Sequence, residues 1–385
     1  MRIIIIGSGA IGSFVGGMLG STGQDVYFYD IPGVAEKLRL GGIKVEGIGS
    51  GVFIENPQAI SSLDELGEDF SMTAAGSFFD LAVISVKSFS TKSIIDVLPD
   101  NLADYVLSFQ NGIGNEEILA EKFGRHRIIA GSITYPVAFP QLGYVRIENT
   151  KGGLSICPIA MATEASGIAE IFRKAGLNII ICRDAAGMKW SKLMLNIVCN
   201  ASCAILGMTP DEIFKDRQLV WIERNMILEL LDVMKAKKIR ATDLPGYPVN
   251  AMKTAYRIMP PSLLKIFLGK AIGKSRGKKK PSLMIEIEKG TTTTEVGYYN
   301  GAIARAGEKA GIPTPVNRLL TDILDGIASG KIPSEKFAKN PSLLYQICRQ
   351  NDDYKMEEGE EREQKEISPA EIMMEPEQIK TEEEV

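Results

Sequence analysis

The chain has 385 residues, of which 45% are hydrophobic and 24% charged, and its formal net charge is −4. A chain of this length forms more than one core, so we expect two domains; no apolar run approaches the ~20 residues that a membrane helix requires. Residues 352–385 carry 14 acidic and 4 basic side chains, whereas the other 351 residues carry 34 acidic and 40 basic ones. This mildly basic body suits an anionic ligand, but it is too weakly basic to indicate a nucleic-acid partner.

Cysteine and histidine usage argues against metal and disulfide chemistry. The five cysteines contain no Cys-x-x-Cys pair, and His126 is the only histidine in the sequence. We therefore expect no metal site and no disulfide framework, and the composition is typical of the reducing cytoplasm. The apolar N-terminus gives way to glycines after five residues, which is typical of a strand and not of a signal peptide.

The first 30 residues carry a dinucleotide-binding pattern. A strand at 2–7 leads into Gly7-Ser8-Gly9-Ala10-Ile11-Gly12, a helix follows to about residue 21, and a second strand covers 25–30. In this context the first glycine permits a tight turn, the second lets the backbone approach a pyrophosphate, and the third allows close helix packing. The helix N-terminus offers N–H groups and a partial positive charge to that pyrophosphate. The pattern predicts nucleotide binding by residues 7–12.

The second predicted strand ends at Asp30. A carboxylate at this position can accept hydrogen bonds from a ribose 2′-hydroxyl and repels a 2′-phosphate, so Asp30 favours NAD over NADP. The alternative is an exposed aspartate at a strand end with no role in binding.

Two further strands are expected to deliver polar side chains to one edge of the sheet. A buried strand at 80–86 is followed by Lys87, and a strand at 105–109 is followed by Gln110-Asn111-Gly112. Because the carboxyl ends of parallel strands line the ligand crevice of open α/β sheets, we expect a ligand beside Lys87 and Asn111. The other elements expected in this domain are short strands at 43–55, an irregular or weakly helical stretch at 56–79, a helix at about 115–123, a strand at 127–133, a β-rich stretch to about 157, a helix near 164–175 and a strand near 178–182.

From about residue 185 the pattern changes to helix, with helical stretches expected at 211–238, 250–272, 283–289, 295–310 and 316–328. The predicted fold class is therefore α/β: an N-terminal Rossmann-type doubly wound sheet over residues 1–184, then an all-α C-terminal domain over 185–350 that carries the substrate and catalytic groups. The lysine-rich segment 265–280 is expected to be a solvated loop, or else a flap that attracts an anionic ligand or an acidic partner. The acidic tail, 351–385, is expected to be disordered or weakly helical.

The most informative stretch is Trp190-Ser-Lys-Leu-Met-Leu-Asn-Ile-Val-Cys-Asn200. Lys192, Asn196 and Asn200 are spaced by four, which predicts one amine and two amides on the same face of a single helix. The residues between them are mostly apolar, and a polar stripe on a buried helix is costly unless its groups have partners. The stripe is either a structural hydrogen-bond ladder or an active-site wall with a proton-donating lysine.

Several motifs follow one another along residues 1–330. They are Gly7 to Gly12, Val86-Lys87, Gln110-Asn111-Gly112, Trp190-Ser-Lys-Leu with Asn196 and Asn200, Glu295-x-x-Tyr298-x-Asn300-Gly301, and Gly311-Ile-Pro-Thr-Pro315-x-Asn317. In this order they resemble the ketopantoate reductase (2-dehydropantoate 2-reductase) family. Trp-x-Lys-Leu with its trailing asparagines is the most specific of these motifs.

The resemblance implies four substrate-binding residues. Lys192 corresponds to the family's proton-donating lysine, and Asn196 and Asn200 correspond to asparagines that contact the substrate. Ser282 resembles a serine that binds the substrate carboxylate, although its spacing to Glu295 is one residue longer than the usual pattern.

The resemblance also implies cofactor contacts outside the glycine-rich segment. Asn111 corresponds to the asparagine between cofactor and substrate, and Lys87 to the lysine that approaches the phosphate end of the cofactor. Glu295 corresponds to the active-site glutamate near the nicotinamide, which makes it a candidate both for catalysis and for cofactor binding. The family often has an arginine after the second strand to hold the 2′-phosphate of NADP, where this chain reads Asp30-Ile31.

The implied activity is the NAD(P)H-dependent reduction of 2-dehydropantoate to pantoate, in pantothenate and coenzyme A biosynthesis, with hydride from the nicotinamide and a proton from Lys192. The family implies NADP whereas Asp30 favours NAD, so both cofactors stay open. The partner expected is a small anionic 2-oxo acid; a homodimer is compatible with the sequence, which does not decide the oligomeric state.

Two alternatives to this activity stay open. One is a dehydrogenase of another small 2-oxo or 2-hydroxy acid, because the segment at about 240–282 is longer than is typical and can reshape the pocket. The other is a non-catalytic protein that senses nicotinamide, with the basic segment and the acidic tail as its partner surfaces.

Overall fold

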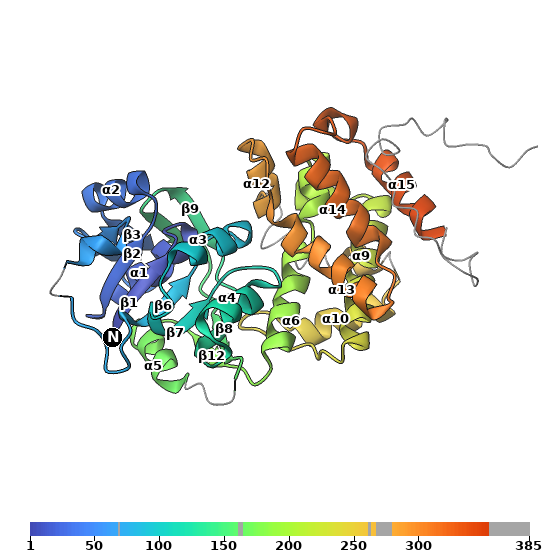
Figure 1. The fold of residues 1–385 in the computed structure, drawn as a ribbon. Coiled ribbons are helices and arrows are strands. Elements are labelled where there is room, and N and C mark those ends of the chain that lie inside the picture. Colours follow the sequence, from blue (N-terminus) through green and yellow to red (C-terminus); the bar gives the residue numbers. More distant parts are fainter. Residues whose placement is uncertain (68–69, 161–164, 261–262, 267–278, 354–385) are drawn as a thin grey trace, which may run out of the picture. The chain divides into compact units, whose positions relative to one another are not determined.

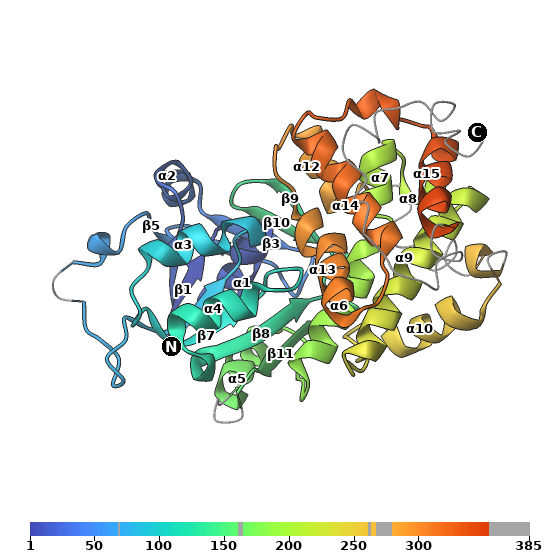
Figure 2. The same ribbon diagram turned by 45° about the vertical axis from the view of Figure 1, so that its right-hand side comes forward.

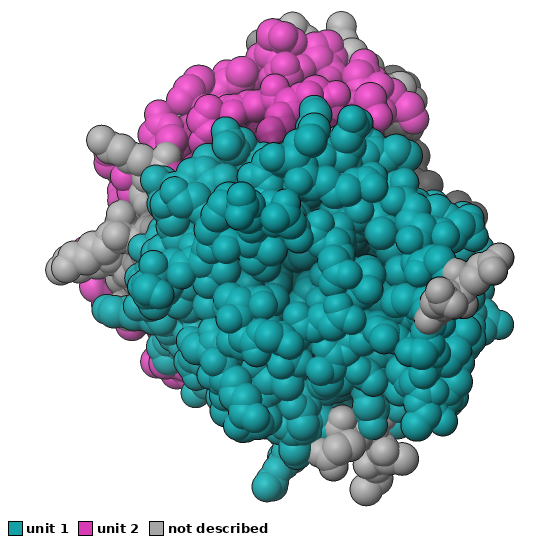
Figure 3. Space-filling model, turned by 90° about the vertical axis from the view of Figure 1, so that its left-hand side faces the viewer, with its two compact units in different colours: residues 1–193, 240–250 teal, residues 194–239, 251–385 magenta. Residues whose placement is uncertain are grey.

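The computed structural model describes residues 1–67, 70–160, 165–260, 263–266 and 279–353 (Figure 1). Its internal contacts divide the chain into two compact units, coloured separately in Figure 3: unit 1 is residues 1–193 with 240–250, and unit 2 is residues 194–239 with 251–385. In the parts of the chain described here, no helix has both the length and the apolar character needed to cross a membrane.

Unit 1 is built on an eight-stranded sheet in the order β12-β11-β8-β7-β6-β1-β2-β5. Its strands are β1 (Arg2–Ile6), β2 (Asp25–Tyr29), β5 (Gln58–Ile60), β6 (Phe79–Ile84), β7 (Ala103–Ser108), β8 (Ile128–Ile133), β11 (Leu154–Pro158) and β12 (Ile179–Ile181). The neighbours from β5 to β8 pair in parallel, and β11 pairs antiparallel with β8. Because the chain first builds outward through β2 and then returns to β6 on the other side of β1, the sheet is doubly wound, as the sequence predicts.

Helices cover both faces of this sheet, and β1 shows why the chain folds in this way. Ile3 and Ile5 share a core with α1 (Ala10–Gly20) and α5 (Ser166–Lys174). Ile4 and Ile6 share the opposite core with α3 (Thr91–Val97) and α4 (Asn115–Phe123), which lie side by side in Figure 2. Successive residues of a strand point to opposite faces, so a strand that is covered on both faces is apolar throughout.

A smaller sheet in the order β4-β3-β10-β9 contacts α1. Its strands are β3 (Ile43–Glu46), β4 (Val52–Ile54), β9 (Val137–Gln141) and β10 (Tyr144–Ile147), and α2 (Pro32–Gly41) precedes it in the chain. The sequence predicts the short strands but an irregular or weakly helical stretch at 56–79, whereas β5 lies in that stretch and pairs with β2. Three residues are too few to produce a recognisable alternation, so only the pairing partner reveals this strand.

The described residues of unit 2 form helices and no strand, in agreement with the predicted all-α domain. Its helices are α7 (Ala201–Leu206), α8 (Pro210–Ile213), α9 (Arg217–Ala236), all but the first two residues of α10 (Val249–Ile258), α12 (Ser282–Glu288), α13 (Asn300–Ala310), α14 (Pro315–Ala328) and α15 (Pro341–Asp353), with a 3₁₀ turn η4 (Glu295–Tyr298).

Three of the predicted helices differ from the observed ones. The helix predicted over 295–310 is divided into η4 (Glu295–Tyr298) and α13 (Asn300–Ala310). The helix predicted over 211–238 is divided, because the Asp216 carboxylate caps the start of α9 by accepting the N–H groups of Gln218 and Leu219. The helix predicted over 250–272 ends at Ile258, shortly before Pro260. Most of the basic segment 265–280, and the tail beyond Asp353, lie outside the described residues.

The two units divide within a single helix, α6 (Ala185–Ile197), between Leu193 and Met194. The sequence places the boundary before this helix, at 184–185. The first turns of α6 belong to unit 1 because polar contacts attach them to it; the backbone N–H of Thr242, in the segment 240–250, donates to the Ser191 hydroxyl at 2.8 Å.

Candidate active site

The glycine-rich loop joins β1 to α1, and close packing leaves no room for a larger residue at Gly7 or Gly12. A Cβ on Gly7, whose φ is +93°, would lie 2.7 Å from Val86 Cγ1, and a Cβ on Gly12 would lie 1.9 Å from the Gly7 carbonyl oxygen. Nothing lies within 4 Å of the Cβ position of Gly9, which precedes α1. The Ser8 hydroxyl is buried and has no hydrogen-bond partner among the described residues. A tight turn with one open side and an unpaired buried donor fits a bound pyrophosphate.

The Asp30 side chain is hydrogen-bonded directly to this loop. Its two carboxylate oxygens accept the backbone N–H groups of Ser8 at 2.6 Å and Ile31 at 2.8 Å. The carboxylate is therefore fixed at the end of β2 beside the loop, and each oxygen retains a lone pair for a further donor. This geometry is compatible with a ribose hydroxyl at Asp30, whose role in cofactor preference stays a prediction.

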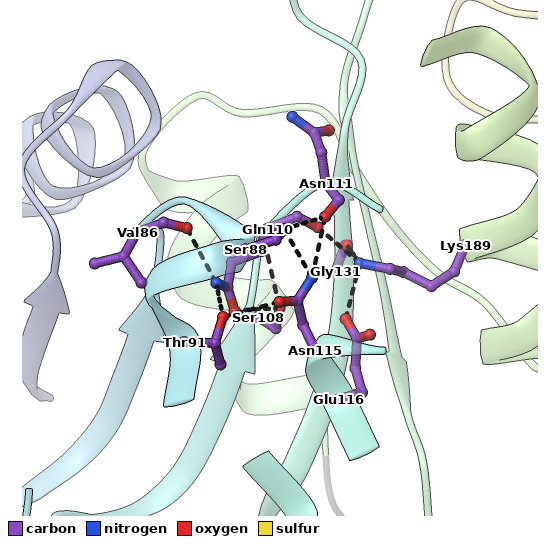
Figure 4. A network of polar contacts seen from close by, with 10 residues as sticks. All are labelled: Val86, Ser88, Thr91, Ser108, Gln110, Asn111, Asn115, Glu116, Gly131 and Lys189. Carbon is purple, nitrogen blue, oxygen red and sulfur yellow. Dashed lines mark hydrogen bonds and ion pairs between the residues drawn. The ribbon is translucent and has the colours of Figure 1, made fainter. Parts of the chain in front are cut away.

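A buried polar network joins the ends of β6 and β7 (Figure 4). The Gln110 side-chain amide donates to the Val86 carbonyl at 3.0 Å and to the Thr91 hydroxyl at 2.7 Å. The Thr91 hydroxyl in turn donates to the Asn115 side-chain oxygen at 2.9 Å. Gln110, Thr91 and Asn115 are all buried, so their paired polar groups hold the two strand ends at a fixed separation.

That network holds the two predicted cofactor contacts at this edge: Asn111 through its own carbonyl, and Lys87 through its chain neighbours. The Asn111 carbonyl accepts the Ser88 hydroxyl at 2.8 Å and the Asn115 amide at 3.0 Å, while the Asn111 side chain points away from the network (Figure 4). Lys87 is exposed and lies between Val86 and Ser88, which both take part in the network. The structure therefore fixes the backbone of Asn111 and of the residues on either side of Lys87, and it directs the Asn111 side chain away from the network.

A buried lysine that the sequence analysis does not single out ties α6 to the same edge. Lys189 Nζ lies 2.8 Å from Glu116 Oε1 and donates to the Gln110 carbonyl at 2.7 Å (Figure 4). Lys189 is 5% exposed and Glu116 is 7% exposed, so the ion pair is shielded from water. A basic residue among the apolar neighbours Met188 and Trp190 is a signal that a buried acceptor must exist, but the sequence does not reveal which one.

After the first two residues of α6, Ala185 and Ala186, only two members of the predicted polar stripe reach the surface. From Gly187 to Asn200 every residue is buried except Lys192 and Asn196, which are partly exposed. The spacing of four therefore places this lysine and this asparagine on one accessible face of a helix that is otherwise buried from Gly187 onward, as the sequence predicts.

The prediction that Asn200 continues the stripe on the same helix is wrong. α6 ends at Ile197, and Cys199 has φ +54°, a left-handed conformation that ends helical geometry. Asn200 lies in the turn before α7, although its side-chain amide still donates to the Asn196 carbonyl at 2.9 Å.

Asn200 and Ser282, two predicted substrate contacts, are in direct contact. The Asn200 amide donates to the Ser282 hydroxyl at 3.2 Å, and the Asn200 side-chain oxygen accepts the backbone N–H of Leu283 at 3.0 Å. The two bonds anchor the first turn of α12 at the turn between α6 and α7. Asn200 is buried and Ser282 is exposed.

Glu295 lies in a buried acidic cluster of unit 2. It is 2% exposed, and its carboxylate accepts the Tyr299 hydroxyl at 3.2 Å. Burial, followed by the charge of Glu295, raises the pKa of Tyr299 well above its ordinary value, so this tyrosine is a neutral donor. The Glu295 backbone N–H donates to the carboxylate of Glu286, which is 8% exposed. Glu286 is not among the predicted site residues, although an acid inside the apolar run that follows Ser282 indicates a buried carboxylate.

The predicted site residues are thus distributed over both units. Unit 1 carries the loop 7–12, Asp30, Lys87, Asn111 and Lys192; unit 2 carries Asn196, Asn200, Ser282 and Glu295. Helix α6 supplies residues to both sets.

Two family models match the chain in sequence order. Residues 3–159 match the model described as ketopantoate reductase PanE/ApbA, and residues 184–328 match the model of its C-terminal part. Among individual proteins, a 2-dehydropantoate 2-reductase from Archaeoglobus fulgidus is 28% identical over 337 residues, which cover 86% of this chain and 98% of that protein.

The solved structures with a similar fold include proteins that are named for different activities. A PanE/ApbA family ketopantoate reductase from Ralstonia eutropha JMP134 has a TM-score of 0.70 at 24% identity, with 86% of this chain and 99% of that chain covered. A D-mandelate dehydrogenase, solved with NADH and anilino(oxo)acetate, has a TM-score of 0.67 at 23% identity, with the same coverage of both chains. At sequence identities this low, the structural similarity indicates a shared fold and does not indicate a shared activity.

Proposed function

Because the chain belongs to the ketopantoate reductase family, we propose that it reduces 2-dehydropantoate to pantoate, with hydride from a nicotinamide cofactor and a proton from Lys192. Family membership supports an oxidoreductase that uses a nicotinamide cofactor. We propose the identity of the substrate, the use of NADPH or NADH, and the role of each residue in addition to this family membership.

The observation that carries the proposal is the exposure pattern of α6. Lys192 and Asn196 are partly exposed, whereas every other residue from Gly187 to Asn200 is buried. A hydrogen-bond ladder between packed helices has no need of access to solvent, whereas a proton donor must be reachable by its substrate. The exposure of these two residues therefore favours the active-site interpretation over the structural one.

The residues at the glycine-rich loop fit a dinucleotide. The buried, unpaired hydroxyl of Ser8 and the N-terminus of α1, which no side chain caps among the described residues, would hold the pyrophosphate. The Asp30 carboxylate would accept the ribose hydroxyls, while Lys87 and Asn111 would approach the cofactor from the ends of β6 and β7. When bound, the nicotinamide supplies the hydride.

Lys192 would act on the substrate oxygen. As an ammonium group it can polarise the ketone and then release a proton to the oxygen as negative charge develops there. Asn196, one turn further along α6, is placed to hold the substrate so that its carbonyl stays beside Lys192. Asn200 and Ser282 would bind the hydroxyl or carboxylate of the same acid. Glu295 is proposed as the acid near the nicotinamide.

A second candidate is the oxidation or reduction of a different 2-hydroxy or 2-oxo acid. The structural similarity to a D-mandelate dehydrogenase supports this candidate, because that protein has the same fold and a different substrate in its name. The chain is only 22–28% identical to the 2-dehydropantoate 2-reductases, so the residues that line its substrate site can differ from theirs.

The two candidates are distinguished by steady-state kinetics. The purified chain is assayed with NADPH and with NADH, by the decrease in nicotinamide absorbance, against 2-dehydropantoate and a panel of 2-oxo acids that includes an aromatic one. The proposal expects the highest kcat/KM for 2-dehydropantoate. A higher value for another 2-oxo acid would support the second candidate, and no oxidation with any acid would contradict both.

A further inference from the structure

Glu223, in the second turn of α9, is a buried acid that the proposed reaction does not use. It is 1% exposed, and its carboxylate is hydrogen-bonded on both oxygens. One oxygen accepts the backbone N–H of Cys199 at 2.8 Å and the other accepts the Ser202 hydroxyl at 2.5 Å. Both donors belong to the short connection in which α6 ends and α7 begins.

The position that Glu223 contacts is the strained point of that connection. Cys199 has φ +54°, a conformation that L-residues other than glycine rarely adopt and that costs of the order of 1 kcal/mol. A buried N–H in such a turn needs an acceptor, and the Glu223 carboxylate is the acceptor that the structure provides.

Asn200 follows Cys199 directly, so the conformation of this turn fixes the direction of the Asn200 side chain. From this turn its amide reaches the Asn196 carbonyl and the Ser282 hydroxyl, and its side-chain oxygen reaches the Leu283 N–H. A change at Cys199 would therefore move the asparagine that connects α6 to α12.

We propose that Glu223 is a positioning residue for substrate recognition: its carboxylate holds the left-handed turn at Cys199 and thereby sets Asn200 against Ser282. The proposal rests on the proposed function, in which Asn200 and Ser282 bind the 2-oxo acid. Glu223 itself touches neither substrate nor cofactor in this scheme.

The chain offers a matched control on the same helix. Glu229, also buried in α9, accepts the backbone N–H groups of Val316 at 2.9 Å and Asn317 at 3.0 Å, at the start of α14. It is therefore another buried carboxylate that caps a helix start, but none of these contacts involves Asn200 or Ser282. Its removal reports the effect of losing a structural acid from α9.

The test compares Glu223→Ala, Glu223→Gln, Glu229→Ala and Asn200→Ala in the full chain, with KM for 2-dehydropantoate and for the cofactor, kcat, and the thermal midpoint of each variant. Glu223→Ala is expected to raise the KM for 2-dehydropantoate by about tenfold, the effect of one lost buried hydrogen bond, with the cofactor KM within about twofold of wild type. Glu223→Gln should restore the KM, because the amide oxygen can accept from Cys199 and the amide nitrogen can donate to Ser202. Glu229→Ala should lower the thermal midpoint without raising the KM.

Several outcomes would overturn the positioning role. They are an unchanged KM in Glu223→Ala, equal changes in Glu223→Ala and Glu229→Ala, or a rise in the cofactor KM that matches the rise for the substrate. If Glu223→Ala does not fold, Ser202→Ala is used instead, because it removes one of the two donors to the Glu223 carboxylate. An unchanged KM for 2-dehydropantoate in that variant would also contradict the positioning role. A raised KM in Asn200→Ala with none in Glu223→Ala rejects only the role of Glu223, whereas no change in Asn200→Ala rejects the proposed substrate site as well.

Discussion

The side-chain amide of Asn200 donates to the hydroxyl of Ser282 at 3.2 Å, across 82 residues of sequence. Both residues are assigned to the substrate by family resemblance, and the structure joins them directly. The pair connects the turn after α6 to the first turn of α12, which also donates the Leu283 N–H to Asn200. If the two side chains bind one substrate group together, their contributions to binding depend on each other.

The first prediction is that Asn200→Ala and Ser282→Ala are not additive. Each single variant is expected to raise the KM for the 2-oxo acid by about tenfold, because each loses one polar contact to the acid. In the double variant the rise should be smaller than the product of the two, since the remaining side chain has lost its orienting partner. A double-mutant cycle on KM measures the coupling; full additivity would show that the two residues act independently.

The second prediction concerns the proton donor. Lys192→Ala is expected to lower kcat by about 100-fold or more while cofactor affinity, measured by fluorescence titration, stays near wild type. Lys192→Arg is the matched control, because arginine keeps the positive charge but does not release a proton at neutral pH. We expect the arginine variant to retain substrate binding and to lose turnover. Near-normal turnover in either variant would exclude Lys192 as the proton donor.

The third prediction concerns the buried ion pair of α6. Lys189→Met leaves the Glu116 carboxylate buried without its ammonium partner, which is expected to cost about 3–5 kcal/mol of unfolding free energy. The double variant Lys189→Met with Glu116→Leu removes both charges and should recover most of that loss. Denaturant unfolding of the three proteins measures the difference. An equal loss in the double variant would show that packing, and not the unpaired charge, causes the destabilisation.

The fourth prediction concerns cofactor preference. Asp30→Ala removes the acceptor proposed for the ribose hydroxyls and the repulsion of a 2′-phosphate, so the ratio of kcat/KM for NADH to that for NADPH should fall by about tenfold. Both individual values are expected to decrease, because Asp30 also accepts the Ser8 N–H in the glycine-rich loop. The ratio separates the two effects: a loss that is equal for both cofactors would assign Asp30 to the loop alone.

The fifth prediction is a pH dependence of stability at Glu223. Burial raises the pKa of this carboxyl from 4.5 to about 7, against the opposing hydrogen bonds from Ser202 and Cys199. The folded protein then binds a proton at Glu223 that the unfolded chain has already released. The stability contributed by that proton is fully present below about pH 4.5 and is lost as the pH rises to about 7.

Glu223→Gln isolates this contribution, since glutamine does not titrate. The unfolding free energy of the variant relative to wild type should rise with pH across this window, by up to about 1.4 kcal/mol per pH unit. The titratable neighbours of Glu223 are Tyr256, whose burial raises its pKa well above the ordinary value, and the Cys199 thiol. Denaturant titrations at a series of pH values measure the difference, and parallel curves for the two proteins would contradict the raised pKa.

Much of the fold and part of the site followed from local sequence patterns. The apolar strand before Gly7, the glycine spacing and the polar strand ends at Lys87 and Asn111 predict the doubly wound sheet and its binding edge, and the structure confirms the sheet. The spacing of Lys192 and Asn196 correctly placed both on one accessible face of α6. These features depend on residues within one or two turns of each other, so the sequence alone can reveal them.

Tertiary structure alone decided what holds those residues in place. The sequence predicts one helix through Asn200, yet that helix ends before Cys199. The buried carboxylate of Glu223, 24 residues further along the chain, accepts the Cys199 N–H and stabilises this turn. Likewise, Lys189 donates a hydrogen bond to the Gln110 carbonyl, 79 residues away in sequence, and Asn200 donates one to Ser282. Local periodicity reports which side of a helix is apolar, whereas the partner of a buried polar group depends on which segments pack against it. The sequence therefore determined the fold class and the candidate catalytic lysine, and the packing of distant segments determined how the surrounding side chains are positioned.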